Sequence, residues 1–503
     1  MFSFPLLSLI IFLPLLGCVT SLVLWRHPRE VRWASLVVLL ADLALIVFAV
    51  FRIEWAGVAD TGWLIKEDLA WIESLGIRYS LTLDGISLIL VLLTAFLGVV
   101  CVLISWREIN SRVGAFHFFI LLTQTGVLGV FLAADLFLFY LFWELQLIPM
   151  FFLIGIWGHD KELRIHATIK FFLFSMTGSL LMLIAIIGLY LIHGSQTGTY
   201  TFAVSQLMQT VLEPSTEMWL FAAFLFAFAI KVPMFPLHTW LPDAHTEAPT
   251  AGSVDLAGLL LKTGTYAILR FAFPLFPLAA QKCTPILLVL GLIGLLYAAW
   301  IALAQSDMKR LVAYSSIGHM GLIIIGLAVW SELTLSGAVL LMVNHGLSTS
   351  ALFVMVGMLA ERTYSREFTD LGGVWKKMPI FGAFFLFFGL ASLGLPGLNN
   401  FVSEILILVG TFQAYPAVAV IGFFSMVFVL IYALRMIQDA MFGEARREHH
   451  LWDVTPREFI VLSSFALLIL VLGLYPQPVL KLLNEPVHRL LSETGRIMAA
   501  RGL

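Results

Sequence analysis

Long apolar runs separated by short polar segments dominate the chain. Each run holds about 20 residues, the length that an α-helix needs to cross the hydrocarbon layer of a bilayer. The pattern therefore predicts an all-α polytopic membrane protein with about fourteen transmembrane helices. The predicted limits are Phe4–Trp25, Trp33–Phe51, Thr82–Ser105, Ala115–Ala134, Leu136–Gly158, Thr168–His193, Met218–Leu241, Thr250–Phe276, Pro285–Gln305, Leu311–Trp330, Leu335–Ala360, Pro379–Thr411, Ala417–Leu434 and Phe459–Tyr475.

Two of these spans carry helix breakers in mid-membrane beside a charged residue. The seventh has Pro233 and Pro236 directly after Lys231, and the twelfth reads ASLGLPGLNNFVSEILILVG around Glu404. Proline removes a backbone donor, and helices broken at membrane depth mark transport sites. The breaks lie five spans apart, and a second copy of a unit with an odd number of crossings is inserted upside down. We therefore expect two inverted five-helix repeats, spans 4–8 and 9–13, with broken helices 7 and 12.

This arrangement gives the expected organisation of the chain. The expected parts are N-terminal spans 1–3 in residues 1–114, the first inverted repeat in 115–276, the second in 277–440, and span 14 with the C-terminal tail in 441–503.

Composition excludes several classes of protein. Of the 503 residues, 60% are hydrophobic and 12% charged, and the formal net charge is −2, so no basic face for nucleic acid is expected. The three cysteines, Cys18, Cys101 and Cys283, stand alone, with no C-x-x-C and no histidine cluster, so neither a metal nor an iron–sulfur site is predicted. No glycine-rich nucleotide-binding motif occurs. Any redox chemistry is therefore expected to belong to another subunit.

Basic residues indicate the orientation of the spans. Alternate loops are rich in Lys and Arg, which predicts that they face the inside and that both chain ends lie outside. The inner set is Arg26, Arg29, Arg32, Arg107, Arg112, Lys161, Arg164, Lys309, Arg310, Arg362, Arg366, Lys376, Lys377, Arg446, Arg447 and Arg457, against Arg52, Lys66, Arg78 and Lys282 outside. The basic C-terminal tail is discordant and is interpreted as an amphipathic surface helix. The polar segment Glu54–Ser80 is expected to form an outer loop that pairs as a hairpin.

Four ionisable residues lie deep within apolar runs: Glu144, Lys231, Lys262 and Glu404. Burying one such charge in a membrane costs roughly 2.5 to 3.5 kcal/mol on the insertion scale, so these residues are candidates for moving charge. Burial weakens the hold of an amine on its proton, and a nearby carboxylate strengthens it. If Glu144 lay within about 4 Å of Lys231, their attraction would be on the order of 4 kcal/mol. Pulling the carboxylate away would then release the proton.

Each candidate also has a structural interpretation. Glu144 and Lys231 can form a static ion pair that fixes helix packing. Lys262 can extend its amine toward the surface, and Glu404 can cap backbone amides. His319 and His345 can be hydrogen-bonded packing residues. His238, Asp243 and His245, which follow the seventh span, are interpreted as solvated loop residues near the inner surface.

Five long motifs carry a family resemblance. They are KVPMFPLHTWLPDAHTEAPTAGSVDLAGLLLKTGTY from Lys231, FYLFWELQLIPMFFLIGIWG around Glu144, QSDMKRLVAYSSIGHMG from Gln305, NHGLSTSALF from Asn344 and LPGLNNFVSEILILVG from Leu395. The chain resembles, over nearly its whole length, the antiporter-like membrane subunits of respiratory complex I and of multisubunit cation/proton antiporters. In that family the deep residue of span 12 is a carboxylate in one type of complex I subunit and commonly a lysine in another type and in antiporters. Glu404 therefore indicates the carboxylate-bearing type.

The resemblance implies a proton-translocating membrane subunit of a bacterial NADH:quinone oxidoreductase, located in the inner membrane beside related antiporter-like subunits. It places NADH, FMN, iron–sulfur clusters and quinone in partner subunits and none in this chain. It implies a route in which Glu144 modulates Lys231, and the proton passes to Lys262, then His319 and Glu404, toward the outer side. His345 is a further candidate for the same site.

Two other functions remain open. One is a subunit of a multisubunit Na⁺/H⁺ antiporter or of a membrane-bound hydrogenase. Glu404 argues against the common antiporter pattern but not against the hydrogenase relatives. The other is a solute carrier with a binding pocket at the midplane, for which the sequence offers no cluster of specificity residues.

Overall fold

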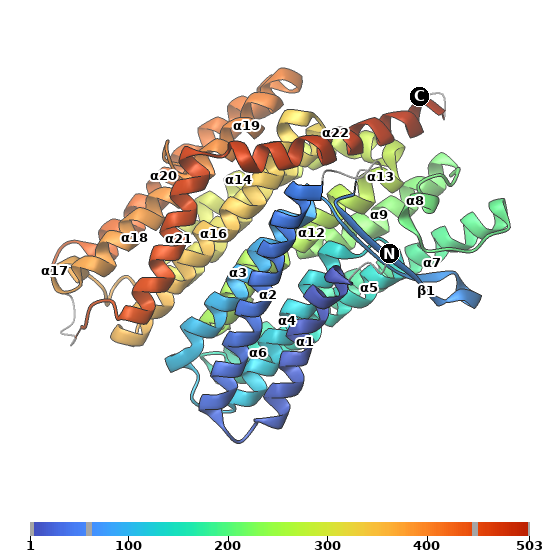
Figure 1. Ribbon diagram of the computed structural model, residues 1–503. Coiled ribbons are helices and arrows are strands. Elements are labelled where there is room, and N and C mark those ends of the chain that lie inside the picture. Colours follow the sequence, from blue (N-terminus) through green and yellow to red (C-terminus); the bar gives the residue numbers. More distant parts are fainter. Residues whose placement is uncertain (1–4, 57–62, 445–450, 501–503) are drawn as a thin grey trace.

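The computed structural model describes residues 5–56, 63–444 and 451–500, and these are almost entirely helical. The elements are α1 (Leu6–Val23), α2 (Pro28–Ala56), β1 (Ile65–Ile72), η1 (Glu73–Leu75), β2 (Ile77–Leu83), α3 (Gly85–Glu108), α4 (Val113–Leu132), α5 (Leu136–Leu145), α6 (Leu147–Trp157), α7 (Lys161–Thr197), α8 (Val204–Leu207), α9 (Pro214–Lys231), α10 (Trp240–Glu247), α11 (Thr250–Asp255), η2 (Leu256–Leu260), α12 (Leu261–Ala267), η3 (Ile268–Ala272), α13 (Phe273–Leu275), α14 (Pro277–Leu303), α15 (Met308–Val329), α16 (Glu332–Thr363), α17 (Val374–Lys377), α18 (Pro379–Ser392), α19 (Asn399–Ala414), α20 (Pro416–Met441), α21 (Pro456–Leu474) and α22 (Gln477–Ala500). The long helices lie side by side in one bundle (Figure 1).

The predicted polytopic all-α fold is confirmed. Among the described residues, 12 helices are long and apolar enough to cross a membrane, and they match twelve of the fourteen predicted spans in order. The two remaining predicted spans are the seventh and the twelfth, and each is divided into two shorter helices. The difference between twelve and fourteen therefore arises at the two predicted breaks. The inverted repeats and their boundaries stay a prediction.

The two breaks follow from proline and glycine. Helix α9 ends at Lys231, two residues before Pro233, and the carbonyl of Ile230 instead accepts a hydrogen bond from the Trp240 indole at 2.9 Å. Helix α18 ends at Ser392, and Gly394 and Gly397 adopt φ of +76° and +92° before α19 begins. Glycine adopts these left-handed conformations without steric cost. The chain thereby turns out of one half-helix and into the next at membrane depth.

Span eight lies at the centre of the bundle and is enclosed along its whole length. It runs from Thr250 to Leu275, and its 18-residue apolar window is 100% buried. Two π-helical segments, η2 and η3, interrupt it on either side of Lys262. An amine in this position has neighbouring helices around it and no lipid-facing surface. The span therefore sets the dry environment of the site.

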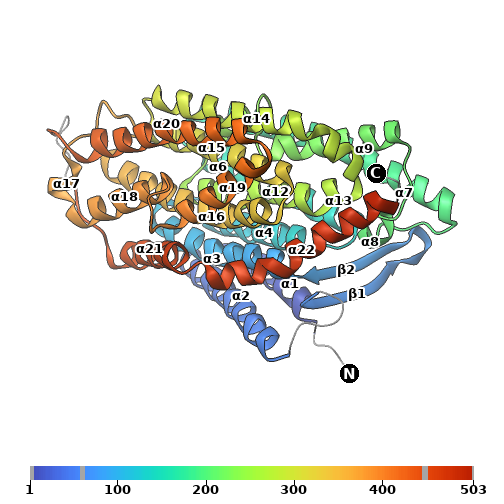
Figure 2. The ribbon, with the colours of Figure 1, turned by 90° about the horizontal axis from the view of Figure 1, so that it is seen from above.

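The hairpin and the C-terminal helix meet at one end of the bundle (Figure 2). Strands β1 and β2 pair in antiparallel fashion, as predicted for the outer loop. Helix α22 lies across the ends of α3 and α16 and buries Leu483 and Val487, which agrees with the predicted amphipathic surface helix. Asp84 caps α3 and pairs with Arg270 and with Arg489, at 3.4 Å for the latter. Burial acts to raise the pKa of Asp84, but the two guanidinium groups and a backbone N–H outweigh it and the pKa is lowered.

Candidate functional site

Four of the six predicted site residues form a row of contacts through the bundle. The Lys262 amine lies 2.7 Å from Nδ1 of His345. The rings of His345 and His319 have centroids 5.2 Å apart, and Nε2 of His319 lies 3.7 Å from Oε1 of Glu404. All four side chains are at most 6% exposed. Since they come from α12, α16, α15 and α19, packing of four helices creates the row.

The position of Lys262 excludes the interpretation that its amine extends toward the surface. The side chain is fully buried, and Nζ donates to the carbonyl of Ala257 as well as contacting His345. Side chains in a helix point back toward its N-terminus, so the amine lies beside the η2 segment and does not extend to the surface. The route predicted a transfer from Lys262 to His319. In the structure His345 contacts both of these residues, and the route itself stays a prediction.

The break in span 12 determines where Glu404 lies. A Cβ atom at Gly394 would be 2.2 Å from Oε2 of Glu404, so only glycine leaves room for the carboxylate. The other oxygen, Oε1, has no hydrogen-bond partner among the described residues. The N-cap residue of α19 is Leu398, whose apolar side chain makes no capping hydrogen bond. The carboxylate is therefore buried in the break and faces His319.

Lys231 and Glu144 form a separate group in the first half of the chain. Lys231 is 3% exposed at the end of α9, and its amine lies 5.2 Å from the centre of the Trp143 ring. Among the described residues, Glu144 and Lys231 form no ion pair within the 4.0 Å that defines one. The static ion pair is therefore not formed in this conformation, and the separation of about 4 Å on which the estimated attraction depends is not reached. Trp143 supplies the contact to the amine instead.

The two groups meet where α12 packs against α9. A Cβ atom at Gly264 would be 3.1 Å from Cβ of Lys231 and 2.8 Å from a methyl group of Val232. Gly264 is two residues from Lys262, so the two lysines approach each other through the backbone of span eight. In the described part of the chain their amines share no hydrogen bond. Two like charges in a dry interior repel, which favours this separation.

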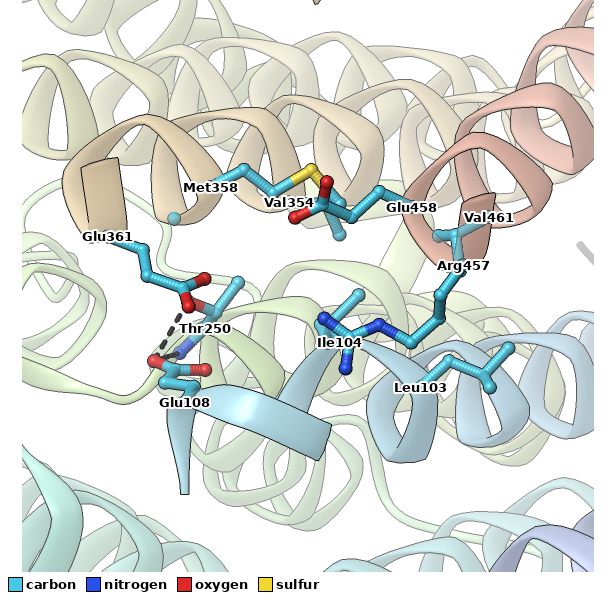
Figure 3. Close-up of a pocket in the computed structure, with 11 residues that line it drawn as sticks. Leu103, Ile104, Glu108, Thr250, Val354, Met358, Glu361, Arg457, Glu458 and Val461 are labelled. Carbon is cyan, nitrogen blue, oxygen red and sulfur yellow. Dashed lines mark hydrogen bonds between the residues drawn. The ribbon is translucent and has the colours of Figure 1, made fainter. Parts of the chain in front are cut away.

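A polar cavity lies at the end of the bundle opposite the hairpin. Its volume is about 540 Å³, and Glu108, Thr250, Lys309 and Glu361 are among the residues that line it. Glu108 accepts hydrogen bonds from the backbone and hydroxyl of Thr250, at 2.9 and 3.0 Å. Figure 3 shows this pair beside Glu361 in an adjoining pocket, with Arg457 on its other side. Polar groups thus reach from this rim to the start of span eight.

The interpretation of His245 as a solvated loop residue is wrong. It is fully buried, stacks on Phe353 with centroids 4.6 Å apart, and has no hydrogen-bond partner for either ring nitrogen among the described residues. The reason is that α10 folds back into the bundle after the break. Asp243 instead pairs with Lys170 at 2.7 Å and with Arg310 at 3.3 Å.

Residues 5–56, 63–444 and 451–500 contain no group of three or more His, Cys, Asp or Glu side chains that could hold a metal ion. The site consists of buried amines, imidazoles and carboxylates, and its two groups meet at the backbone of span eight around Gly264. Such groups can hold and pass protons.

Comparison with known proteins identifies the class. Residues 133–429 match the family model described as NADH:quinone oxidoreductase/Mrp antiporter, TM. The chain therefore belongs to this family of membrane subunits. It is 47% identical to NADH-quinone oxidoreductase subunit M of Pseudomonas aeruginosa, over 91% of each chain. It is 43% identical to subunit M of Escherichia coli K12, over 94% of this chain and 95% of that protein.

A solved structure agrees with this assignment. Respiratory complex I from Thermus thermophilus with bound NADH contains a chain with a TM-score of 0.85 and 31% identity, covering 96% of this chain and 99% of that one. Glu404 predicted the carboxylate-bearing type of complex I subunit, and the similarity to subunit M confirms that prediction. The chain is thus a multi-pass membrane protein of the complex I family.

Proposed function

We propose that this chain is the proton-translocating M-type membrane subunit of a bacterial NADH:quinone oxidoreductase. The observation that carries the proposal is the buried row from Lys262 through His345 and His319 to Glu404, which joins span eight to the break in span 12. Apolar side chains would pack the centre of a membrane protein at a lower free-energy cost than ionisable ones. Packing alone therefore does not explain a row of proton-exchanging groups there.

Electron transfer takes place in other subunits. We place NADH, FMN, iron–sulfur clusters and quinone in those partners, because the chain is similar over most of its length to subunit M, a membrane subunit of NADH-quinone oxidoreductase. The partners in the membrane are other complex I subunits, including related antiporter-like chains. The chain acts as part of a translocase, and we assign the redox centres to its partners.

The proposed route has two parts. Lys231, with Trp143 and Glu144 beside it, receives or releases a proton as the position of Glu144 changes. The proton then passes from the Lys231 region to Lys262 and along the buried row to Glu404. Since the lysine amines are not hydrogen-bonded to each other, water between α9 and α12 is expected to complete that step.

The orientation and the repeats belong to the same proposal. The basic loops, which include Arg107, Lys309 and Arg366, lie at the end opposite the hairpin, and the positive-inside rule then places both chain ends outside in the inner membrane. Residues 115–276 and 277–440 are proposed as inverted repeats, because each contains one broken span with a buried ionisable residue beside the break.

The test is a lysine substitution in the assembled complex. Lys231→Ala is expected to abolish proton uptake by inverted membrane vesicles and the NADH oxidation that is coupled to it, because Lys231 supplies the amine that lies over Trp143. Lys282→Ala changes an exposed lysine and is the matched control. The isolated chain is expected to oxidise no NADH. Normal pumping by Lys231→Ala would end the mechanism, and purification with antiporter subunits and no flavoprotein would favour the antiporter or hydrogenase assignment instead.

A further inference from the structure

The carbonyl oxygen of Ser392 occupies a special position in the break of span 12. It ends α18, and the residue that would donate to it in a continuous helix is Pro396, which has no N–H. Two side chains reach this oxygen instead. Nε2 of His319 lies 3.1 Å from it, and the amide nitrogen of Asn400 lies 3.4 Å from it. One carbonyl is therefore shared between a residue of the buried row and an uncharged neighbour.

Both ring nitrogens of His319 lie close to backbone carbonyl oxygens. Its Nδ1 lies 2.9 Å from the carbonyl oxygen of Ser315, so both ring nitrogens face an oxygen that can only accept. A neutral imidazole has one N–H, whereas the imidazolium has two and can donate to both. Glu404, with Oε1 at 3.7 Å from Nε2, supplies the opposite charge. The geometry fits a protonated His319 beside an ionised Glu404.

Asn400 is held so that its amino group faces the carbonyl. The hydroxyl of Ser348 donates to its Oδ1 at 3.4 Å, which leaves the NH₂ group for Ser392. Asn400 is fully buried and lies one helical turn before Glu404 on α19. Ser348 lies one turn after His345 on α16. Asn400 thus links the helices that carry His345 and Glu404 to the carbonyl that His319 contacts.

We propose that Asn400 is a positioning residue that weakens the hold of the Ser392 carbonyl on His319, so that the Nε2 proton can pass to Glu404. Two donors on one oxygen share its negative charge, so each is bound less tightly than it would be alone. The transfer breaks the N–H bond at Nε2 and forms an O–H bond at Oε1, leaving a neutral imidazole and a neutral carboxylic acid. Nε2 must approach Oε1 from 3.7 Å to the usual hydrogen-bond distance of about 2.8 Å. This inference rests on the proposed function.

Other titratable groups surround His319, and their presence is common to all variants in the test. They are Glu404 from α19, His345 from α16, Lys262 from α12, Tyr432 from α20 and, next to His345, His245 from α10.

The test replaces the amide of Asn400 in the complete enzyme. Asn400→Leu leaves the Ser392 carbonyl to His319 alone, so His319 holds its proton to higher pH. We expect coupled turnover to fall about fivefold, the equilibrium factor for one ordinary hydrogen bond, and the pH profile of turnover to move to higher pH. Both are measured with NADH and quinone in membranes containing equal amounts of assembled complex.

Asn399→Leu is the matched control. Asn399 is buried in the same break, but it exchanges hydrogen bonds with Asn344, at 2.7 and 3.0 Å, and its side-chain amide donates to the Asn344 carbonyl and not to that of Ser392. The pH profile of turnover for Asn399→Leu is expected to coincide with that of the wild type, even if its turnover is lower. A profile for Asn400→Leu that coincides with the wild type, or an equal displacement in Asn399→Leu, overturns the proposal.

A second variant covers a failure of Asn400→Leu to assemble. Ser348→Ala removes the hydroxyl that orients Asn400, and a smaller displacement in the same direction is expected. No displacement in Ser348→Ala overturns the proposal in that case. The proposed function is judged separately by Lys231→Ala: if that variant does not pump and the Asn400 and Ser348 variants behave as wild type, only the present inference fails.

Discussion

Gly394→Ala should disable the enzyme by moving one carboxylate. The new Cβ would lie 2.2 Å from Oε2 of Glu404, whereas a carbon–oxygen contact needs about 3.3 Å, so the carboxylate must retreat by about 1 Å. Glu404 already lies 3.7 Å from His319, and a misplacement of this size can reduce a rate on the order of 100-fold. We expect coupled NADH oxidation and proton uptake to fall by about tenfold to 100-fold in vesicles with normal amounts of complex.

The control separates this effect from backbone strain. Alanine in a left-handed conformation costs roughly 1–2 kcal/mol wherever it occurs. Gly198 has φ of +75°, against +76° for Gly394, but no atom lies within 4 Å of its added Cβ. Gly198→Ala therefore has the same backbone cost without the collision, and it should pump normally. Equal activity of the two variants would show that the carboxylate is not confined by Gly394 and would refute the reasoning.

Two further changes test other contacts. Trp143→Leu removes the aromatic face 5.2 Å from the Lys231 amine, a contact worth about 2 kcal/mol in a dry site, so coupled turnover should fall about tenfold or more, whereas Trp143→Phe should retain part of it; equal turnover in all three proteins would contradict this. Asp84→Asn should make thermal unfolding less sensitive to acid. Burial and the stronger opposing effect of Arg270 and Arg489 leave the folded pKa of Asp84 below 3.8, so its stabilising contribution is present above that value and is lost as the pH falls through the folded pKa. An unchanged acid profile would show that this pairing does not stabilise the fold.

Spans and breaks could be predicted because both are local properties of the chain. Apolar runs of sufficient length mark membrane helices whatever surrounds them. Pro233 and Pro396 act on backbone donors in their own turn, so the breaks beside Lys231 and before Glu404 could be read directly from the sequence.

Lateral packing could not be predicted in the same way. His345 lies between Lys262 and His319 because α16 packs against both span eight, at α11 and η2, and α15, and no spacing along the chain encodes that contact. The contact between Trp143 and Lys231 could not be predicted, since aromatic side chains are common in membrane helices and nothing in the sequence marks this one. The burial of His245 depends on the direction in which α10 leaves the first break. The position of His245 soon after the broken span is the sequence feature that could have indicated its burial.

The π-helical segments on either side of Lys262 have a mechanical consequence. A π-type turn contains one residue more than an α-helical turn, so converting η2 to α-helix would rotate the following residues by about 100° and shift them by about 1.5 Å. If α12 took up the extra residue in a turn after Lys262, the residues beyond that turn would keep their places. Lys262 can then swing away from one neighbour toward another while Thr250 and Leu275 stay where they are. The extra residue of a π-helical turn thus allows the Lys262 amine to be reoriented without a translation of the whole span.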